Sequence, residues 1–162
     1  SKVSGADSYR VYKYNSKTKK YDFYKAVSGT KLTIKKLKSG TSYKYLVRAV
    51  TLTADKVKVT GEAKTLTVST LPKAPEIKVT TKGGTATVKW SKVTGATGYR
   101  IYCMDSKTKK LTLIGTVKSN KTSFKKSGYK KGSKYLFAVR ACKTLNGENL
   151  FSEYSRVTVK MK

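Results

Sequence analysis

The chain has 162 residues, of which 38% are apolar, and a formal net charge of +29 at pH 7. It has no histidine, only eight carboxylates and two cysteines, so it lacks most side chains used in acid–base, nucleophilic and metal-assisted catalysis. No apolar run approaches the roughly 18 residues of a membrane-spanning helix. We therefore expect a protein that is not an enzyme, with no cofactor and no metal, built from small cores rather than one large one.

The sequence contains two similar copies of one unit, offset by 90 residues near the start and by 92 further on. The matching pairs of segments are residues 1–6 and 91–96, 9–12 and 99–102, 15–20 and 105–110, and 40–43 and 132–135. The framework keeps its order while one loop gains two residues. The chain is therefore a tandem repeat of one unit.

Apolar residues in the repeat recur with a period of two. Tyr99 and Ile101 flank Arg100, and further along Phe137 and Val139 belong to the same kind of series. Such alternation is typical of half-buried strands, and Gly-Gly and Asn-Gly pairs between the runs indicate turns. No window has the apolar stripe of a helix. Each copy is predicted to be an antiparallel β-sandwich.

Two prolines separate the copies. Pro72 and Pro75 fix the backbone and withhold donors from a sheet, so they mark a short linker. The predicted division is residues 1–71 for the first domain, 72–74 for the linker and 75–162 for the second domain.

The second copy resembles a fibronectin type III domain of the kind strung along surface proteins of Gram-positive bacteria. In chain order, the resemblance places strands at residues 75–81 (A), 85–90 (B), 98–104 (C), 110–117 (C′), 122–126 (E), 135–142 (F) and 155–161 (G). Trp90 takes the place of the family's core tryptophan. Residues 129–135 resemble the corner before strand F, in which a tyrosine hydroxyl bonds to nearby backbone. Tyr129 and Lys131 stand there in place of the family's usual leucine and proline, whereas Leu37 keeps the leucine in the first copy.

The implied fold class is all-β, with two tandem immunoglobulin-like (fibronectin type III) antiparallel sandwiches, the first lacking its N-terminal strands. Ser1 aligns with Ser91, which directly follows Trp90, so nothing in the first copy corresponds to strands A and B. We expect that copy to keep strand E and the C′-C-F-G sheet. We also expect the chain to be a piece of a longer precursor, whose preceding segment or a neighbouring subunit donates strands that fill the gap.

The repeated lysine-rich segments, residues 15–20 and 105–110, fall where strand C turns into C′. We interpret them as solvated turns, with a dedicated docking loop as the alternative.

The positive charge is spread along the chain: residues 1–72 carry +12 and residues 73–162 carry +17. Only five of the 37 cations are arginine, the side chain that favours bidentate phosphate and base recognition. This distribution predicts non-specific, salt-sensitive binding to polyanions rather than a nucleic-acid reader. A basic spacer in an anionic cell wall is the preferred interpretation.

One surface is a candidate ligand site. The strand layout places arginines of strands C and F on the outward face of each copy, together with a tyrosine from strand C. This possible ligand face consists of Arg10, Tyr12 and Arg48 in the first copy and Arg100, Tyr102 and Arg140 in the second. It could hold an acidic or glycan ligand, or the side chains could stack on one another and simply cover the sheet.

The two cysteines are predicted to be free thiols. Strands C and F are antiparallel neighbours in this layout, with Cys103 and Cys142 near opposite ends of the pair. Several residues of strand rise exceed the roughly 7 Å that a disulfide allows between Cα atoms.

Together these features predict non-catalytic spacer or interaction modules of a larger secreted or cell-wall-associated bacterial protein. The expected partners are flanking domains of the same precursor and an anionic cell-wall polymer or glycan. One alternative is an adhesin segment that binds a host or wall glycan or anionic polymer. Another is an accessory module of a carbohydrate-active enzyme. The fold alone does not name a ligand.

Overall fold

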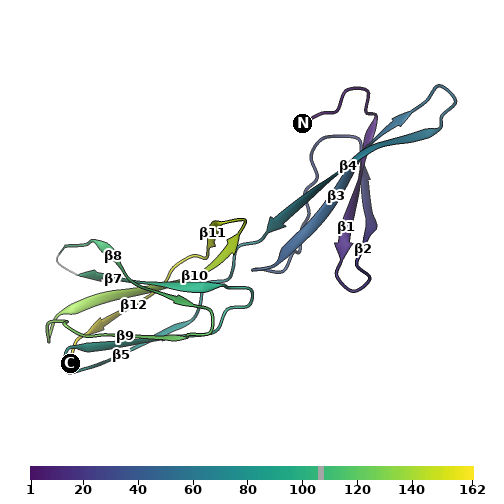
Figure 1. Cartoon of the computed structure of the whole chain (residues 1–162). Helices are drawn as coiled ribbons and strands as arrows, with labels where there is room; N and C mark the ends of the chain where they lie inside the picture. Colours follow the sequence, from purple (N-terminus) through teal and green to yellow (C-terminus); the bar gives the residue numbers. More distant parts are fainter. Residues whose placement is uncertain (106–107) are drawn as a thin grey trace. The chain divides into compact units, whose positions relative to one another are not determined.

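The computed structural model describes residues 1–105 and 108–162. Over these residues the chain forms β-strands joined by turns and loops and contains no helix (Figure 1), so the prediction of an all-β fold is confirmed. The chain divides into two compact units. The first unit is Ser1–Leu37 with Ser42–Ser69, and the second is Lys38–Thr41 with Thr70–Lys162. The linker at residues 72–74 stays a prediction.

The first unit is built on one antiparallel sheet with strand order β2-β1-β3-β4. Its strands are β1 (Ser8–Asn15), β2 (Lys20–Val27), β3 (Ser42–Leu52) and β4 (Lys58–Ser69). This order is that of the predicted C′-C-F-G sheet. Tyr9, Val11 and Tyr45, from the central strands β1 and β3, are 8%, 6% and 3% exposed.

The prediction of a strand E in the first copy is wrong. Residues 28–37 form no strand, although Leu32, Ile34 and Leu37 are partly buried. The second unit shows the physical reason. There the equivalent strand, β9 (Ser123–Lys126), pairs with β6 (Thr85–Trp90), and the first copy has no sequence equivalent to β6. Without a partner backbone, this segment cannot form a ladder of inter-strand hydrogen bonds.

The second unit is a sandwich of two antiparallel sheets. One sheet has the order β5-β6-β9, where β5 is Ile77–Lys82. The other has five strands, with β11, β10, β7 and β8 in order and β12 also paired to β10. Its strands are β7 (Gly98–Asp105), β8 (Leu111–Lys118), β10 (Lys134–Leu145), β11 (Glu148–Phe151) and β12 (Ser155–Lys160).

Strand β11 was not predicted. β10 continues three residues beyond the predicted end of strand F, and its last residues pair with β11 from Cys142 opposite Phe151 to Leu145 opposite Glu148. The turn between them is Asn146-Gly147, with φ of 50° and 83°. Positive φ at both central residues is the pattern of a tight hairpin turn, for which Asn-Gly is strongly preferred.

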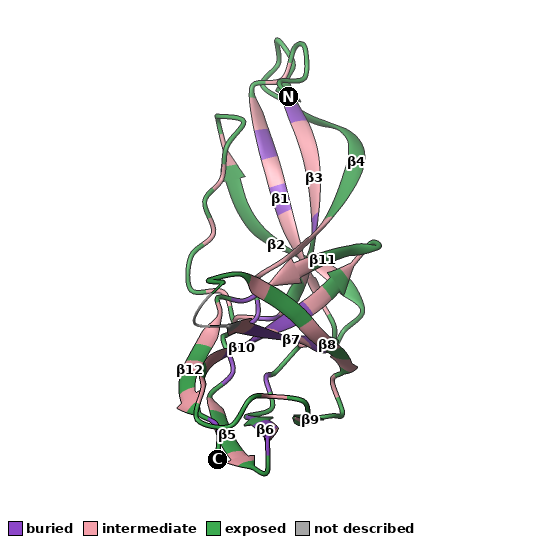
Figure 2. Ribbon diagram, turned by 90° about the vertical axis from the view of Figure 1, so that its left-hand side faces the viewer, coloured by how far each residue is buried: buried purple, intermediate pink, exposed green. Residues whose placement is uncertain are grey.

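The core of the second unit lies between its two sheets. Tyr99 and Phe137, on β7 and β10, are fully buried, and Trp90 from β6 is 6% exposed with its ring 5.3 Å from that of Tyr99. Figure 2 shows the buried residues gathered on these strands. The Tyr99 hydroxyl accepts a hydrogen bond from the Val93 amide at 2.8 Å.

The first unit repeats this last contact, because the Tyr9 hydroxyl accepts from the Val3 amide, also at 2.8 Å. A tyrosine at the same place in each copy therefore ties the loop before the strand to the core. The repeat contains the signal for this contact, because both tyrosines and the segments before them are matched between the copies.

The corner before strand F forms as the resemblance implies. The Tyr135 hydroxyl accepts a hydrogen bond from the Lys130 amide at 3.3 Å. The Tyr129 ring packs edge-on against the rings of Tyr135 and Phe137, at 4.8 and 5.4 Å between centroids. Burial raises the pKa of the Tyr129 phenol, and the neighbouring Cys103 side chain raises that pKa further.

The two cysteines are not joined by a disulfide. Cys103 lies opposite Phe137, whereas Cys142, five positions later on β10, lies opposite Gly98. Five residues of strand rise are about 17 Å, well beyond the reach of an S–S bond. The predicted register and its consequence for the thiols are confirmed.

Candidate functional site

The six residues of the possible ligand face lie where the strand layout put them. Arg100 on β7 is directly opposite Arg140 on β10, and Arg10 on β1 is directly opposite Arg48 on β3. Because side chains alternate along a strand, each opposed pair shares one face of its sheet. That face is the side away from the buried residues Tyr9 and Tyr99.

In the second unit these arginines are packed between aromatic rings. The Arg140 guanidinium lies 3.8 Å from the ring centroid of Phe151, 4.8 Å from that of Tyr154 and 5.5 Å from that of Tyr102. Arg100 also lies over Phe151, at 4.5 Å, and Arg156 lies over Tyr154, at 5.0 Å. We call this group the arginine–aromatic layer. It consists of Arg100, Tyr102, Arg140, Phe151, Tyr154 and Arg156.

The layer is closed by its own side chains. Tyr102 is only 8% exposed, and its ring meets that of Tyr154 edge-on at 5.2 Å. The Arg140 Nε atom is buried without a hydrogen-bond partner. Burial raises the pKa of the Tyr154 phenol, although the Arg140 guanidinium acts in the opposite direction. Cation–π contacts of this kind contribute about 0.5–2 kcal/mol each. The arrangement therefore covers the outer side of the sheet as a second small core.

Three of the six residues of the layer were not predicted from the sequence: Phe151, Tyr154 and Arg156. Arg156 is on β12 and Tyr154 directly precedes that strand, and their spacing of two residues could have placed both on one face. Phe151 belongs to β11, so it could not be assigned without that strand. The register then sets Phe151 opposite Cys142, beside Arg140.

The equivalent face of the first unit is built differently. The Tyr12 ring packs edge-on against Phe23 at 5.8 Å, and an Arg48 Nη donates a hydrogen bond to the Gly61 carbonyl at 3.1 Å. β4 pairs with β3 from Ser42 to Leu52, with one irregularity, so it occupies the edge that β11 and β12 share in the second unit. The six residues therefore do not form a common site in the two copies.

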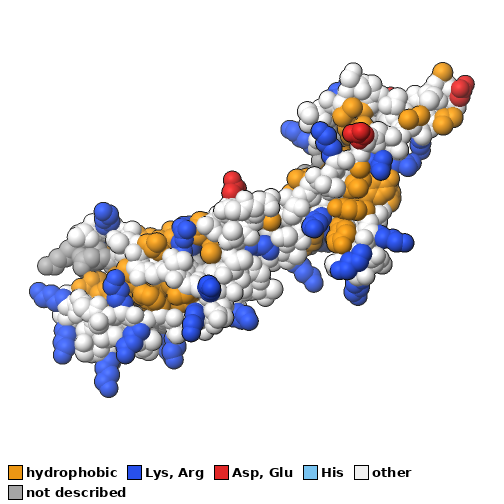
Figure 3. All heavy atoms as spheres, viewed as in Figure 1, with side chains coloured by type: hydrophobic (Ala, Val, Ile, Leu, Met, Phe, Trp, Pro, Cys, Tyr) orange, Lys and Arg blue, Asp and Glu red, His pale blue; other side chains and the backbone are white. Residues whose placement is uncertain are grey.

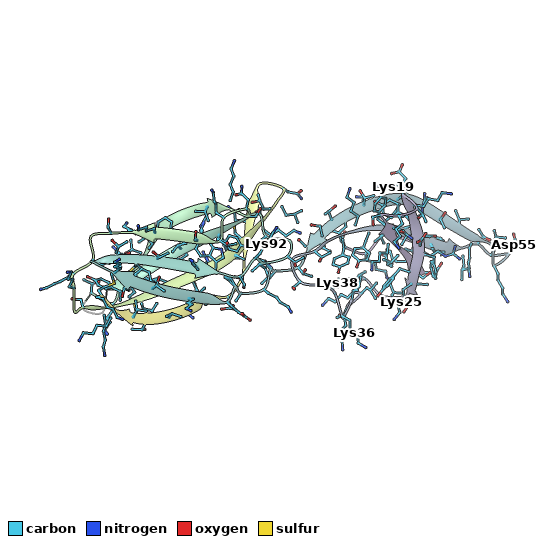
Figure 4. The ribbon with its side chains drawn as sticks, turned by 90° about the horizontal axis from the view of Figure 1, so that it is seen from below. Lys19, Lys25, Lys36, Lys38, Asp55 and Lys92 are labelled. Atoms are coloured by element: carbon cyan, nitrogen blue, oxygen red, sulfur yellow. The ribbon has the colours of Figure 1, made fainter. Side chains whose placement is uncertain are left out.

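The lysine-rich turn of the first copy has the features of a solvated turn. The Asn15 Oδ1 accepts hydrogen bonds from the amides of Lys17 and Thr18 at 3.0 and 3.4 Å, and Asn15 Nδ2 donates to Asp22 at 2.9 Å. Lys19, with φ of 58°, projects from this turn (Figure 4). The matching segment of the second copy, residues 105–110, lies partly outside the described residues.

The inner face of the first unit carries a hollow of about 530 Å³. It is lined mainly by apolar side chains of all four strands and of the segment after β2: Tyr9, Val11, Val27, Leu32, Ile34, Leu37, Tyr45, Val47, Leu66 and Val68. Leu66 is 52% exposed. Figure 3 shows hydrophobic side chains on the surface of this unit.

Tyr45 shows how the inner face differs from a complete core. Its hydroxyl is buried without a hydrogen-bond partner. Burial raises the pKa of this phenol, and the neighbouring Tyr24 and Tyr43 raise it further. The equivalent residue of the second copy is Phe137, which is fully buried and has no hydroxyl.

Residues 1–105 and 108–162 contain no cluster of three or more His, Cys, Asp or Glu side chains suited to a metal ion. In the same part of the chain, no helix is long and apolar enough to cross a membrane.

No protein-family profile and no curated protein matches the sequence. Among solved structures, the chain is similar to a segment of two fibronectin type III domains from chicken tenascin. The sequence identity is 20%, the match covers 99% of this chain and 87% of the other, and the TM-score is 0.61. A chicken contactin fragment with domains FN1–FN3 matches over 98% of this chain and 55% of its own length, with 17% identity and a TM-score of 0.49. A structure of FN3tt matches over 56% of this chain and 94% of its own length, with 24% identity and a TM-score of 0.46.

The tenascin comparison shows that the chain has the fold of fibronectin type III domains.

Proposed function

We propose that the chain consists of two tandem fibronectin type III-like modules, which act as a spacer or interaction segment of a larger protein. The observation that carries this proposal is the arginine–aromatic layer. Its charged groups are held against the protein's own rings, with Arg140 3.8 Å from the Phe151 centroid. The surface that the sequence singled out for a ligand thus stabilises the module.

The proposed setting is outside the cell or in the wall of a Gram-positive bacterium. The support for this is the charge, +29 with 32 lysines to five arginines, which suits weak association with an anionic wall polymer. Lysine and arginine side chains are spread over the visible surface of both units (Figure 3). The proposed partners are the flanking domains of the same precursor and such a polymer.

The hollow of the first unit supports a further partner, a donated pair of strands. In the second unit, β5 and β6 cover the corresponding inner face with apolar residues at every second position. Attaching a copy of residues 75–90 directly before Ser1 reproduces the order found around Ser91. The first unit should then unfold at a higher temperature. An unchanged unfolding temperature would contradict strand donation of this type.

Two other functions remain as alternatives. As an adhesin segment, the chain would use Arg100, Tyr102 and Arg140 to hold a glycan or an anionic polymer. As an accessory module, it would act beside a carbohydrate-active catalytic domain.

The double variant Arg100→Ala with Tyr102→Ala separates the spacer from the adhesin. The spacer function predicts a lower thermal stability of the second unit and unchanged binding to an array of wall and host glycans. The adhesin function predicts saturable glycan binding by the unmodified chain that the double variant loses.

A further inference from the structure

The outer side of the sheet β5-β6-β9 presents only residues that can donate hydrogen bonds. In all three strands, every second residue points away from the core, and none of these outward residues is acidic, apolar or aromatic. We call this surface the lysine–threonine face. It consists of Lys78, Thr80, Lys82, Thr85, Thr87, Lys89, Ser123 and Lys125.

The strand register arranges these residues in rows across the sheet. Lys78, Lys89 and Ser123 form the first row, Thr80, Thr87 and Lys125 the second, and Lys82 and Thr85 the third. Rows are about 6.7 Å apart and neighbours within a row about 4.8 Å apart. Ammonium and hydroxyl groups are thus interspersed over a regular array.

The array carries a like-charge contact that an anion would relieve. Lys78 and Lys89 are directly opposite each other. Like charges at such positions destabilise a sheet, and none of the eight residues is a carboxylate. Over the second and third rows, a hollow of about 420 Å³ is lined by residues that include Thr80, Lys82 and Lys125. Cations and hydroxyls therefore surround a space open to a ligand.

The outer side of the other sheet of the same unit is largely covered by its own side chains, apart from the opposed pair Lys134 and Lys160 at the end of β10 and β12. The guanidinium groups of Arg100 and Arg140 lie over the Phe151 ring, and Arg156 lies over Tyr154. The lysines of β5, β6 and β9 have no aromatic neighbours among the outward residues of their sheet. An anion can therefore reach them without breaking a packed layer.

We propose that the lysine–threonine face binds an extended polymer of phosphate esters joined by flexible, non-aromatic polyol units. This inference rests on the proposed function and assigns its polyanion contact to one surface. The ammonium groups neutralise the esters, and the threonine hydroxyls bond to the linking units. A single-stranded nucleic acid fits less well, because the face has neither an aromatic ring on which a base could stack nor an arginine.

The test compares two variants of the full chain with equal charge. The face variant replaces Lys78, Lys82, Lys89 and Lys125 by Gln. The control variant replaces by Gln four lysines in or next to the five-stranded sheet, namely Lys110, Lys118, Lys134 and Lys160. The probes are a labelled glycerol-phosphate oligomer of about twelve units, a heparin oligosaccharide and a dT oligonucleotide of similar length. Anisotropy gives the affinity at several salt concentrations, and the emission of Trp90 checks that both variants fold.

The expected difference in salt dependence follows from the release of about 0.7 counterions for each lysine–phosphate contact. Four contacts account for a slope of about −3 in log K against log salt, or roughly a 50-fold loss of affinity between about 50 and 200 mM salt. We expect the face variant to lose this part of the slope for the glycerol-phosphate oligomer, while the control variant keeps most of it.

Three results would overturn the inference. Equal losses of slope in the two variants would mean that binding is diffuse, and the spacer function would stand. Tighter binding of the heparin oligosaccharide or the dT oligonucleotide through the same lysines would mean that the polymer class is wrong. No binding of any probe by the unmodified chain at about 50 mM salt would remove both this face and the polyanion partner in the proposed function.

Discussion

Replacing Arg140 by Ala should destabilise the second unit, because Arg140 is the centre of the arginine–aromatic layer. Its guanidinium lies within 5.5 Å of three ring centroids, those of Phe151, Tyr154 and Tyr102. At about 0.5–1 kcal/mol for each contact, the loss is about 1.5–3 kcal/mol. For a unit of this size, that corresponds to a fall of roughly 6–24 °C in Tm.

Trp90 provides the assay for this substitution. It is the single tryptophan of the chain and is 6% exposed in the core of the second unit. Its fluorescence during thermal unfolding therefore reports that unit alone. Arg156→Ala is the matched control, because Arg156 is exposed and lies over the Tyr154 ring only, at 5.0 Å. We expect a loss below about 1 kcal/mol for the control. Equal effects of the two substitutions would refute the view that the layer is a packed core.

Three further substitutions or treatments test other parts of the structure. Tyr45→Phe should raise the stability of the first unit by about 1 kcal/mol at pH 7, because it removes a buried hydroxyl without a partner. Since burial raises the pKa of this phenol above its value in the unfolded chain, the unfolded phenol ionises first, and the free energy of unfolding falls as the pH rises above about 10. Denaturant unfolding followed by tyrosine circular dichroism should show that the free energy of unfolding of the variant falls less above about pH 10. Under mild oxidation, mass spectrometry should find no bond between Cys103 and Cys142, and a bond within the native chain would contradict the register. Gly115→Ala should cost about 1–3 kcal/mol in chemical denaturation, because its Cβ would lie 2.5 Å from the Phe124 ring, and an unchanged midpoint would show that the ring moves aside.

Much of the fold could be predicted because one unit is repeated and its strands alternate strictly. In the second copy, the predicted strands B and E differ from β6 and β9 by at most one residue at either end. The placement of Arg100 and Arg140 on one face of the sheet followed from the same alternation. Patterns of period two determine which face of a sheet a residue occupies. This was sufficient to place the six candidate residues on the outward faces of their sheets.

The failures of prediction have a common cause, because each depends on which strands pair. The segment with Leu32 and Ile34 has the apolar pattern of a strand but no partner in the first copy. Phe151 was missed because β11 is four residues long and forms only through the turn at Asn146-Gly147. Pairing between segments is a tertiary property, which local pattern alone does not determine.

The side chains of Arg100 and Arg140 allow the most direct test of the central claim, that the candidate ligand face is a packed part of a non-catalytic module. NMR can follow their Nε–H signals in the full chain while neutral and acidic oligosaccharides and a glycerol-phosphate oligomer are added at about 150 mM salt. The account predicts that both signals stay unchanged and that the buried Arg140 Nε–H exchanges slowly with water. Saturable shifts of these signals, or fast exchange at Arg140, would contradict it.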